Sequence, residues 1–448
     1  MNNILIKNVQ LVNEGRIEVK DVLMKQQHIE RIDDQISVKE NAIEINGEGL
    51  HLLPGLIDDQ VHFREPGLTY KADIHSEARA AVAGGVTSFM EMPNVKPPTL
   101  NHQLLEEKYQ IARHHSVANY SFFMGVSNDN AEEALRTNEY KRDVCGLKIF
   151  MGSSTGNMLV DNIVTLEKIF AGSEMLIATH CEQEDIIRQN IEKLKAENIN
   201  YNDASFHPVI RNTEACYESS LGAIQLAKKH NTRLHILHIS TAKELQLFTN
   251  LFPLQQKRIT AEVCVHHLHF TADDYPQYGN LIKCNPAIKA KENKEALWQA
   301  LLDDRLDIIA TDHAPHTWEE KQLPYTEAPA GIPLVQHSLY LLLQAYKEGR
   351  ISLEKIVEKA CHAPAICFDV KERGYLREGY FADAVLVDLN KNYKVGKENI
   401  LYKCGWSPFE GHTFPALIEK TFVNGHIAFE NGSVNENEKG LRLSFERN

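Results

Sequence analysis

Eight short apolar segments constrain the fold of this chain more than any other feature. They lie at 52–58, 86–92, 120–125, 146–150, 175–179, 234–239, 259–265 and 307–311. Helical patterns separate most of them: Ile74, Ala78, Ala81 and Val82 recur at core-facing spacing, and residues 215–229 are rich in helix formers. Eight strand–helix units within about 310 residues predict an α/β fold of the TIM (β/α)8 barrel type.

An open, doubly wound sheet is the competing architecture. Its dinucleotide-binding form carries a glycine-rich fingerprint directly after the first strand. The residues that follow segment 52–58 contain no such fingerprint. The barrel is therefore the favoured fold.

Both ends of the chain have the texture of short antiparallel strands. Residues 1–50 contain short apolar segments broken by Asn, Gly and Asp, and similar segments return at 384–388 and 420–429. In the second of these, Asn424-Gly425 marks a hairpin turn. We expect one small β-sandwich domain built from residues 1–53 and 366–448 around a barrel at 54–365; two separate β appendages are the alternative.

Composition excludes several classes of partner. The net charge is -13, and no Lys/Arg-rich stripe stands out, which argues against nucleic acid. The start of the sequence lacks a signal-peptide core, and no apolar run reaches about 18 residues. We therefore expect no membrane span and a cytoplasmic location. The 8 cysteines form no CxxC pair and are expected to be reduced.

Polar residues gather where the predicted strands end. His62 and Arg64 share one face after the first strand, because side chains alternate along a strand. The other residues of this kind are Asn94, Lys148, His180, His238, Asp312 and His316. Strand ends of a barrel converge on one mouth, so this set predicts a metal site beside an anion-binding arginine.

These residues stand in motifs that resemble the amidohydrolase superfamily and, within it, the dihydroorotases. The motifs are Pro54-Gly55-Leu56-Ile57-Asp58, His62-Phe63-Arg64-Glu65-Pro66-Gly67, Met92-Pro93-Asn94, Gly146-Leu147-Lys148, Thr179-His180-Cys181-Glu182, His238-Ile239-Ser240 and Ala310-Thr311-Asp312-His313-Ala314-Pro315-His316. The resemblance covers residues 4–432, including the split β domain. It implies hydrolysis of the cyclic amide of dihydroorotate, or closure of carbamoyl aspartate in pyrimidine synthesis.

The resemblance also implies a role for each site residue. One or two zinc ions would be held by His62, Lys148, His180, His238 and Asp312, with Lys148 carboxylated by CO2 to bridge two metals. Asp312 would accept the proton of the attacking water and return it to the leaving nitrogen. The expected substrate-binding residues are Arg64, Asn94, His316 and, on weaker grounds, Asn285, together with the backbone at Gly331 and Ile332.

One position departs from the pattern. Relatives carry His-x-His after the first strand, whereas this chain carries Gln60-Val61-His62. A neutral amide oxygen is a weak zinc ligand, so we expect Gln60 to hold its ion loosely or the site to work with fewer ions. Asp59 is not expected to compensate, because strand alternation points it away from His62.

Several interpretations remain open at this stage. For Lys148 the alternative is an ordinary lysine that is hydrogen-bonded to an acid. For Asn94 it is a turn residue after Pro93, and for Asn285 it is a residue that only shapes a loop. The cluster of His266, His267 and His269 is expected to form pocket wall or to support the ligands from outside.

Rival functions are kept beside dihydroorotase. A hydantoinase or allantoinase would share the barrel and metals but generally lacks an arginine at position 64. A non-catalytic dihydroorotase-like scaffold is supported only by Gln60. The expected partner is the small-molecule substrate. We also allow for a homodimer, although no residue in the sequence requires one.

Overall fold

The barrel lies at the centre of the protein, seen here in a computed structural model that describes residues 3–38, 41–152 and 158–447. Its strands are β6 (Leu56–Val61), β7 (Val86–Glu91), β8 (Asn119–Phe122), β9 (Met124–Gly125), β10 (Leu147–Met151), β11 (Ile177–Cys181), β12 (Leu234–Ile236), β13 (Ile259–Cys264) and β14 (Ile308–Ala310). β8 and β9 are two halves of one predicted strand, separated at Phe123. Neighbouring strands pair in parallel in the order of the sequence.

The last strand meets the first, which closes the barrel. The amide of His62 donates to the carbonyl of His313 at 2.7 Å. Beside this contact, the Thr311 hydroxyl donates to the Asp58 carboxylate at 2.6 Å. The buried faces of the strands are mostly apolar, as the sequence predicts for parallel strands covered by helices. The predicted barrel is confirmed.

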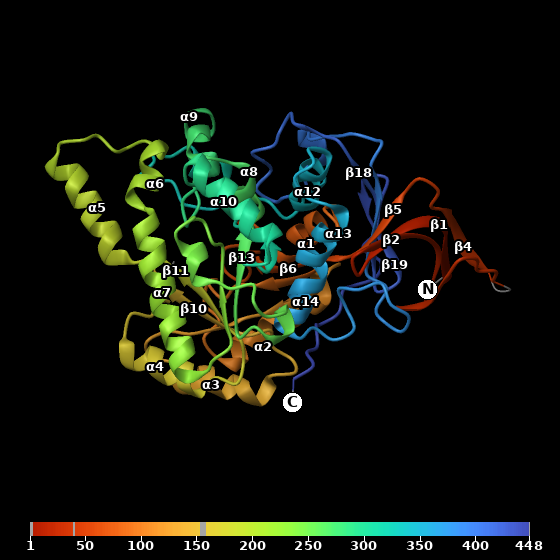
Figure 1. The fold of residues 1–448 in the computed structure, drawn as a ribbon, viewed down its shortest axis with the longest axis horizontal. Helices are drawn as coiled ribbons and strands as arrows, with labels where there is room; N and C mark the ends of the chain where they lie inside the picture. Colours follow the sequence, from red (N-terminus) through yellow and green to blue (C-terminus); the bar gives the residue numbers. More distant parts are fainter. Residues whose placement is uncertain (1–2, 39–40, 153–157, 448) are drawn as a thin grey trace.

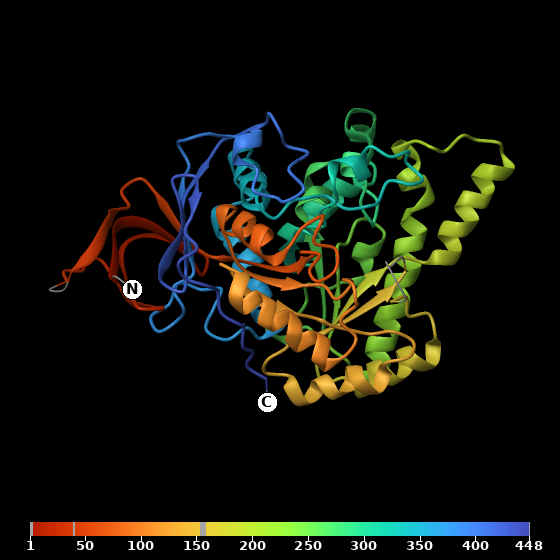
Figure 2. The ribbon, with the colours of Figure 1, turned by 180° about the vertical axis from the view of Figure 1, so that it is seen from behind.

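Helices surround the barrel, and the long α5 and α7 lie at the end farthest from the terminal strands in both views (Figures 1 and 2). The helices are α1 (Ile74–Ala83), α2 (His102–His115), α3 (Ala131–Leu135), α4 (Ile163–Gly172), α5 (Glu184–Ala196), α6 (His207–Ile210), α7 (Thr213–His230), α8 (Val265–His269), α9 (Tyr275–Tyr278), α10 (Lys291–Leu302), α11 (Trp318–Lys321), α12 (Ser338–Lys347), α13 (Leu353–Val357) and α14 (Ala363–Phe368). Within the described ranges, none is long and apolar enough to cross a membrane.

Strands from both chain ends form one sheet beside the barrel (Figure 1). They are β1 (Asn3–Asn13), β2 (Arg16–Lys25), β3 (His28–Asp33), β4 (Ala42–Asn46), β5 (His51–Pro54), β15 (Ala384–Asp388), β18 (Leu417–Val423), β19 (His426–Glu430) and β20 (Ser433–Val434). β15 pairs antiparallel with β5, and residues from both ends share one apolar core. The expected single β domain is confirmed over two separate appendages. A smaller hairpin, β16 (Tyr393–Lys394) with β17 (Thr413–Phe414), lies apart from this sheet.

The predicted turn at Asn424-Gly425 joins β18 to β19. Both residues have positive φ, 47° and 75°. A two-residue hairpin turn of type I′ needs such angles, and this is why Asn-Gly predicted it.

The predicted extent of the first barrel strand was wrong in one respect. Segment 52–58 is divided between β5 of the terminal sheet and β6 of the barrel. The break falls at Gly55, where a Cβ would lie 2.1 Å from the Thr87 hydroxyl. Only glycine lets the chain cross so closely between the two sheets.

The C-terminal segment returns from the terminal sheet to the barrel. Tyr120, near the start of β8, donates its amide to the Leu441 carbonyl, and Leu443 donates to the Tyr120 carbonyl. Arg447 donates to the Cys145 carbonyl at 2.8 Å. Residues 366–448 therefore contact the barrel as well as building the sheet, and the exact domain boundaries stay a prediction.

Candidate active site

Asp312, at the end of the eighth strand, lies beside two side chains of the first. Its Oδ1 is 3.1 Å from His62 Nε2 and accepts a hydrogen bond of 3.1 Å from Gln60 Nε2. The other ring nitrogen of His62 lies 2.8 Å from Asn94 Oδ1. Oxygen acceptors therefore face both ring nitrogens of His62, although a neutral imidazole carries only one proton. With that proton on Nδ1, Nε2 and Asp312 Oδ1 would face a shared cation, as two ligands of one metal do.

Gln60 turns its amide nitrogen to Asp312, while its amide oxygen lies 3.8 Å from the Cys264 thiol. In this orientation it offers Asp312 a donor. Its part as a weak metal ligand stays a prediction.

His180 and His238 form a second pair of facing imidazoles. His180 Nδ1 lies 2.9 Å from His238 Nε2, and both rings are buried. His180 Nε2 lies 3.1 Å from Glu182, which pairs with Arg211 at 2.5 Å. Burial alone would raise the pKa of Glu182. The positive charge of Arg211 and the hydrogen bond with His180 outweigh burial and lower this pKa to about 2, so Glu182 stays a carboxylate. A carboxylate on the outer nitrogen of a histidine is the usual support of a metal ligand.

Lys148 lies on β10 with its amine buried. Its Nζ has no hydrogen-bond partner among the described residues and lies 4.5 Å from the centre of the Phe150 ring. Burial lowers the pKa of Lys148 to about 7, although the charges of Glu262 and Asp312 oppose the shift. The alternative of a lysine hydrogen-bonded to an acid is not what this arrangement shows.

Arg64, two residues after His62, is only 5% exposed. Its Nε donates to the Pro315 carbonyl at 3.2 Å, and its Nη2 lies 3.1 Å from His316 Nε2. Lys71 lies 3.0 Å from the other ring nitrogen of His316 and pairs with Glu320 at 2.9 Å. Within the described residues, Arg64 forms no ion pair with a carboxylate. A buried, unpaired guanidinium is costly, which suits a site that receives an anion.

The remaining expected substrate residues are placed near this pocket in different ways. Asn94 uses its amide oxygen at His62, so its amide nitrogen is the group it can offer to a substrate. Asn285 is held by His207 at 3.0 Å. The carbonyl of Ala330 lies 3.0 Å from His316, and at Gly331 a Cβ would lie 2.3 Å from the Ala314 carbonyl.

Three site residues have a backbone conformation that side chains rarely adopt. Arg64, His238 and Asp312 have φ of 69°, 41° and 47°. Such conformations persist where the surrounding structure holds them, and they gather at functional sites. Each of the three residues lies two or three positions after the end of its barrel strand.

A second layer of ionisable groups lies inside the barrel. His235 is 3.3 Å from Asp59 and 3.2 Å from Glu262, and Glu262 also accepts from the amide of His238 at 3.0 Å. Bonds to the two acids raise the pKa of His235 to about 9 against the effect of burial, so it is a cation. Asp59 thus faces His235.

The sequence reasoning missed these supporting groups. Glu182 stands two residues after His180, a spacing that could have suggested it. Arg211, Lys71 and His235 carry no local signal, because their partners lie in distant segments. His313, although it follows the eighth strand, bonds to Glu77 at 2.9 Å and accepts from the amide of Leu334.

Comparison with known proteins places this chain in one family. A model of the Amidohydrolase family matches residues 51–428, and the chain belongs to that family. Among curated relatives, Dihydroorotase from Methanothermobacter thermautotrophicus is 32% identical over 400 residues, covering 88% of this chain and 87% of the relative. Dihydroorotase from Pyrococcus furiosus is 30% identical, covering 96% and 92%.

Solved structures repeat the whole fold. L-Hydantoinase (dihydropyrimidinase) from Arthrobacter aurescens has a TM-score of 0.92 at 26% identity and covers 99% of this chain and 100% of its own. Dihydropyrimidinase from Brevibacillus agri NCHU1002 has a TM-score of 0.86 at 24% identity, a likeness of fold. The curated sequence relatives are named dihydroorotases. The structural neighbours, which share the fold of this chain, are named hydantoinase or dihydropyrimidinase.

Proposed function

We propose that this protein is a dihydroorotase, a hydrolase that opens the cyclic amide of dihydroorotate to carbamoyl aspartate and closes it again in pyrimidine synthesis. The curated relatives of that name match nearly the whole chain. Assaying the purified protein with dihydroorotate, carbamoyl aspartate and a hydantoin, beside metal analysis, tests the proposal. Preference for the hydantoin would contradict it.

The single observation that carries the substrate is the unpaired guanidinium of Arg64. Dihydroorotate bears a carboxylate, whereas hydantoins and dihydropyrimidines lack one. A planar guanidinium binds a carboxylate through two parallel hydrogen bonds. Burial lowers the pKa of His316 well below its usual range, with Arg64 acting in the same direction, so His316 adds polarity without charge. The pocket holds the positive charges of Arg64 and Lys71 and the negative charge of Glu320, which leaves it with one net positive charge.

Zinc is the metal we propose, one or two ions per chain. The ligands would be His62, Lys148, His180, His238 and Asp312, with Gln60 as a weak additional ligand. Three features fit this role: His62 Nε2 beside the Asp312 carboxylate, the facing nitrogens of His180 and His238, and the orphaned amine of Lys148. When bound, zinc polarises the amide carbonyl and lowers the pKa of a water from about 15.7 to about 7.

Lys148 would act as its carbamate. The amine is buried and unpartnered, and a neutral amine is the form that adds to CO2. The adduct is an anion, which would place a negative charge between the imidazole pairs. Zinc identity and the carbamate are parts of this proposal.

Asp312 would carry the proton in both directions. In hydrolysis, water oxygen bonds to the ring carbonyl carbon, the carbon–nitrogen bond breaks, and one water proton passes through Asp312 to the departing nitrogen. Gln60 donates to Oδ1 of this carboxylate and holds it in place. Arg64 and His316 would fix the substrate carboxylate, and the amide nitrogen of Asn94 and the side chain of Asn285 would complete the pocket.

Replacing Gln60 by histidine is expected to tighten the ion held by His62 and Asp312, because imidazole is a better zinc ligand than a neutral amide. In the wild type, this ion should leave on mild chelation before the ion at His180 and His238. Titrating zinc into metal-free wild type and Gln60→His, with bound metal and turnover followed together, measures both effects.

Gln225→His, at an exposed position of α7 with no metal-ligating side chain three or four residues away, is the matched control and should leave both affinities unchanged. Two equally tight zinc ions in the wild type, unaffected by Gln60→His, would show that something other than residue 60 completes the site.

Glu182→Gln is expected to weaken zinc binding by about 10- to 100-fold, the usual loss when the outer partner of a metal-ligating histidine is removed. The amide still accepts from His180 but carries no charge. Zinc affinity measured by competition with a chelator checks the effect, and Glu192→Gln on the exposed face of α5 is the control. An affinity equal to that of the wild type would remove Glu182 from the metal site.

A hydantoinase-type activity is the second candidate, favoured by the neighbour at TM-score 0.92. Its substrates give the buried Arg64 no anion, so we rank it below dihydroorotase. A non-catalytic scaffold rests on Gln60 alone, whereas the other proposed site residues are all present in the sequence. A homodimer and a cytoplasmic location stay predictions.

A further inference from the structure

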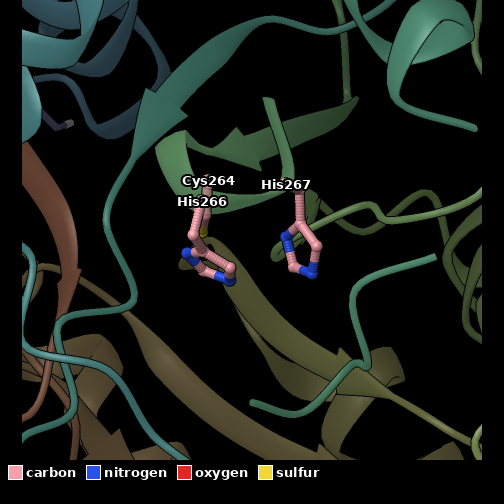
Figure 3. A group of neighbouring side chains, drawn as sticks. All are labelled: Cys264, His266 and His267. Atoms are coloured by element: carbon pink, nitrogen blue, oxygen red, sulfur yellow. The ribbon is translucent and has the colours of Figure 1, made fainter. Parts of the chain in front are cut away.

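A cluster of metal-ligating side chains lies at the end of the seventh strand, outside the proposed ligand set. Cys264 ends β13, and His266 and His267 follow in α8 (Figure 3). All three are buried, and one ligand atom from each lies within 4.8 Å of the others. The rings of His266 and His267 are 4.1 Å apart between centroids. His269, in contrast, packs on Phe270 and Phe409.

Both histidines are buried, and each has at least one ring nitrogen without a regular hydrogen-bond partner. Among the described residues, neither ring nitrogen of His266 makes a hydrogen bond of regular geometry, and the backbone of Thr311 is the polar group beside the ring. His267 Nε2 lies 3.1 Å from the Pro286 carbonyl, which fixes the proton there, and its Nδ1 has no partner. Buried polar atoms are nearly always satisfied, so orphaned nitrogens beside a thiol call for an explanation. A carbonyl on the outer nitrogen is how metal-ligating histidines are oriented.

The surroundings of the cluster favour a cation. Cys264 lies at 3.8 Å from both Glu262 and the amide oxygen of Gln60. The acidic groups around the Cys264 thiol are Glu262, Asp312, Asp58 and Asp59, and the cation His235 lies between Asp59 and Glu262. These acidic groups outnumber the cation and would stabilise a divalent ion bound at the thiol.

We propose that Cys264, His266 and His267 form a zinc site of their own beside the active-site mouth. Zinc is borderline-soft and takes thiolate and imidazole together, in tetrahedral sites. Two such ligands of one ion stand about 3.5 Å apart, given bonds of about 2.0–2.3 Å, so the side chains need to close by about 1 Å. On binding, the thiol proton leaves to solvent as the sulfur–zinc bond forms.

This site explains what the orphaned nitrogens do, and it places an ion near position 60. The Cys264 thiol faces Gln60, the residue that stands where relatives carry a histidine. The proposal does not rest on the reaction proposed above, since it concerns side chains outside that ligand set.

Cobalt in place of zinc provides the test, because Co²⁺ bound to a thiolate has a charge-transfer absorption in the near ultraviolet. The full chain is stripped of metal with a chelator and titrated with Co²⁺ alone. The proposed active-site ligands include no cysteine. We expect the absorption in wild type, and we expect Cys264→Ser to lose it together with one equivalent of bound cobalt.

Cys181→Ser is the matched control, since Cys181 is also buried and adjoins the proposed ligand His180. It should keep the absorption. His266→Gln and His267→Gln should each lower the affinity for the thiolate-bound cobalt. The loss should exceed the roughly 10- to 100-fold that follows removal of an outer partner of a metal ligand.

Three results would overturn the site: no thiolate absorption in wild type, absorption retained in Cys264→Ser, or absorption lost in Cys181→Ser alone. The wild-type spectrum decides even if Cys264→Ser fails to fold, which circular dichroism checks. Turnover of dihydroorotate is measured separately, so failure of this site and failure of the proposed reaction are distinguishable.

Discussion

Asp312→Asn is expected to reduce turnover of dihydroorotate by about 10²–10⁴-fold, the usual contribution of a general acid–base group. Asparagine keeps the size of the side chain and tolerates the positive φ of 47° at this position, so the backbone should not move. It cannot carry the proton from water to the leaving nitrogen. Arg64, Asn94 and His316 remain, and substrate binding should therefore persist.

Measuring kcat and, separately, the Kd of dihydroorotate distinguishes lost chemistry from lost binding. Asp273→Asn, at an exposed position, is the control for the substitution itself. Metal content is determined in the same samples, because Asp312 is also a proposed ligand. Activity of Asp312→Asn within about tenfold of wild type would rule out this residue as the proton carrier.

The barrel could be predicted because parallel strands covered by helices are apolar on both faces and stand out in the sequence. The exact strand ends could not. Residues 52–58 read as one apolar run, and the break at Gly55 depends on the close approach of Thr87 from β7. Local sequence does not record such a distant contact.

The site was predictable to the extent that barrel topology gathers strand ends. His62, Asp312, His180 and His238 meet in two facing pairs because their strands end at one mouth. Simple alternation is less reliable for finer detail, since the pairing of β6 with β7 shifts register between Asp58 and Val61. This irregularity helps to explain why the neighbours Asp59 and Gln60 both contact groups inside the barrel.

The orientation of the polar groups could not be predicted from the sequence. Gln60 looked like a weak ligand by residue type, but its nitrogen faces Asp312 because that carboxylate, 252 residues away, accepts a hydrogen bond from it. His266 and His267 looked like pocket wall until the lack of partners for their nitrogens was visible. Hydrogen-bond satisfaction is a property of the packed structure, and it carries the information that spacing lacks.

Arg64→Lys is expected to raise the KM for dihydroorotate and for carbamoyl aspartate by roughly 10- to 100-fold. A hydrogen bond to a charged group contributes about 1.5–3 kcal/mol, and lysine replaces a planar fork with one point charge. The carboxylate is common to both substrates, so both directions of the reaction should suffer alike. Steady-state kinetics in the two directions measures the effect.

Substrates without a carboxylate separate this reading from general damage to the pocket. Any turnover of hydantoin or dihydrouracil should have the same KM in wild type and Arg64→Lys, because Arg64 has nothing to bind in them. Arg113→Lys, on the exposed side of α2, controls for the substitution. If wild type hydrolyses the carboxylate-free substrates as well as dihydroorotate, the unpaired guanidinium of Arg64 does not select the substrate, and both the assignment of Arg64 and the proposed reaction fail.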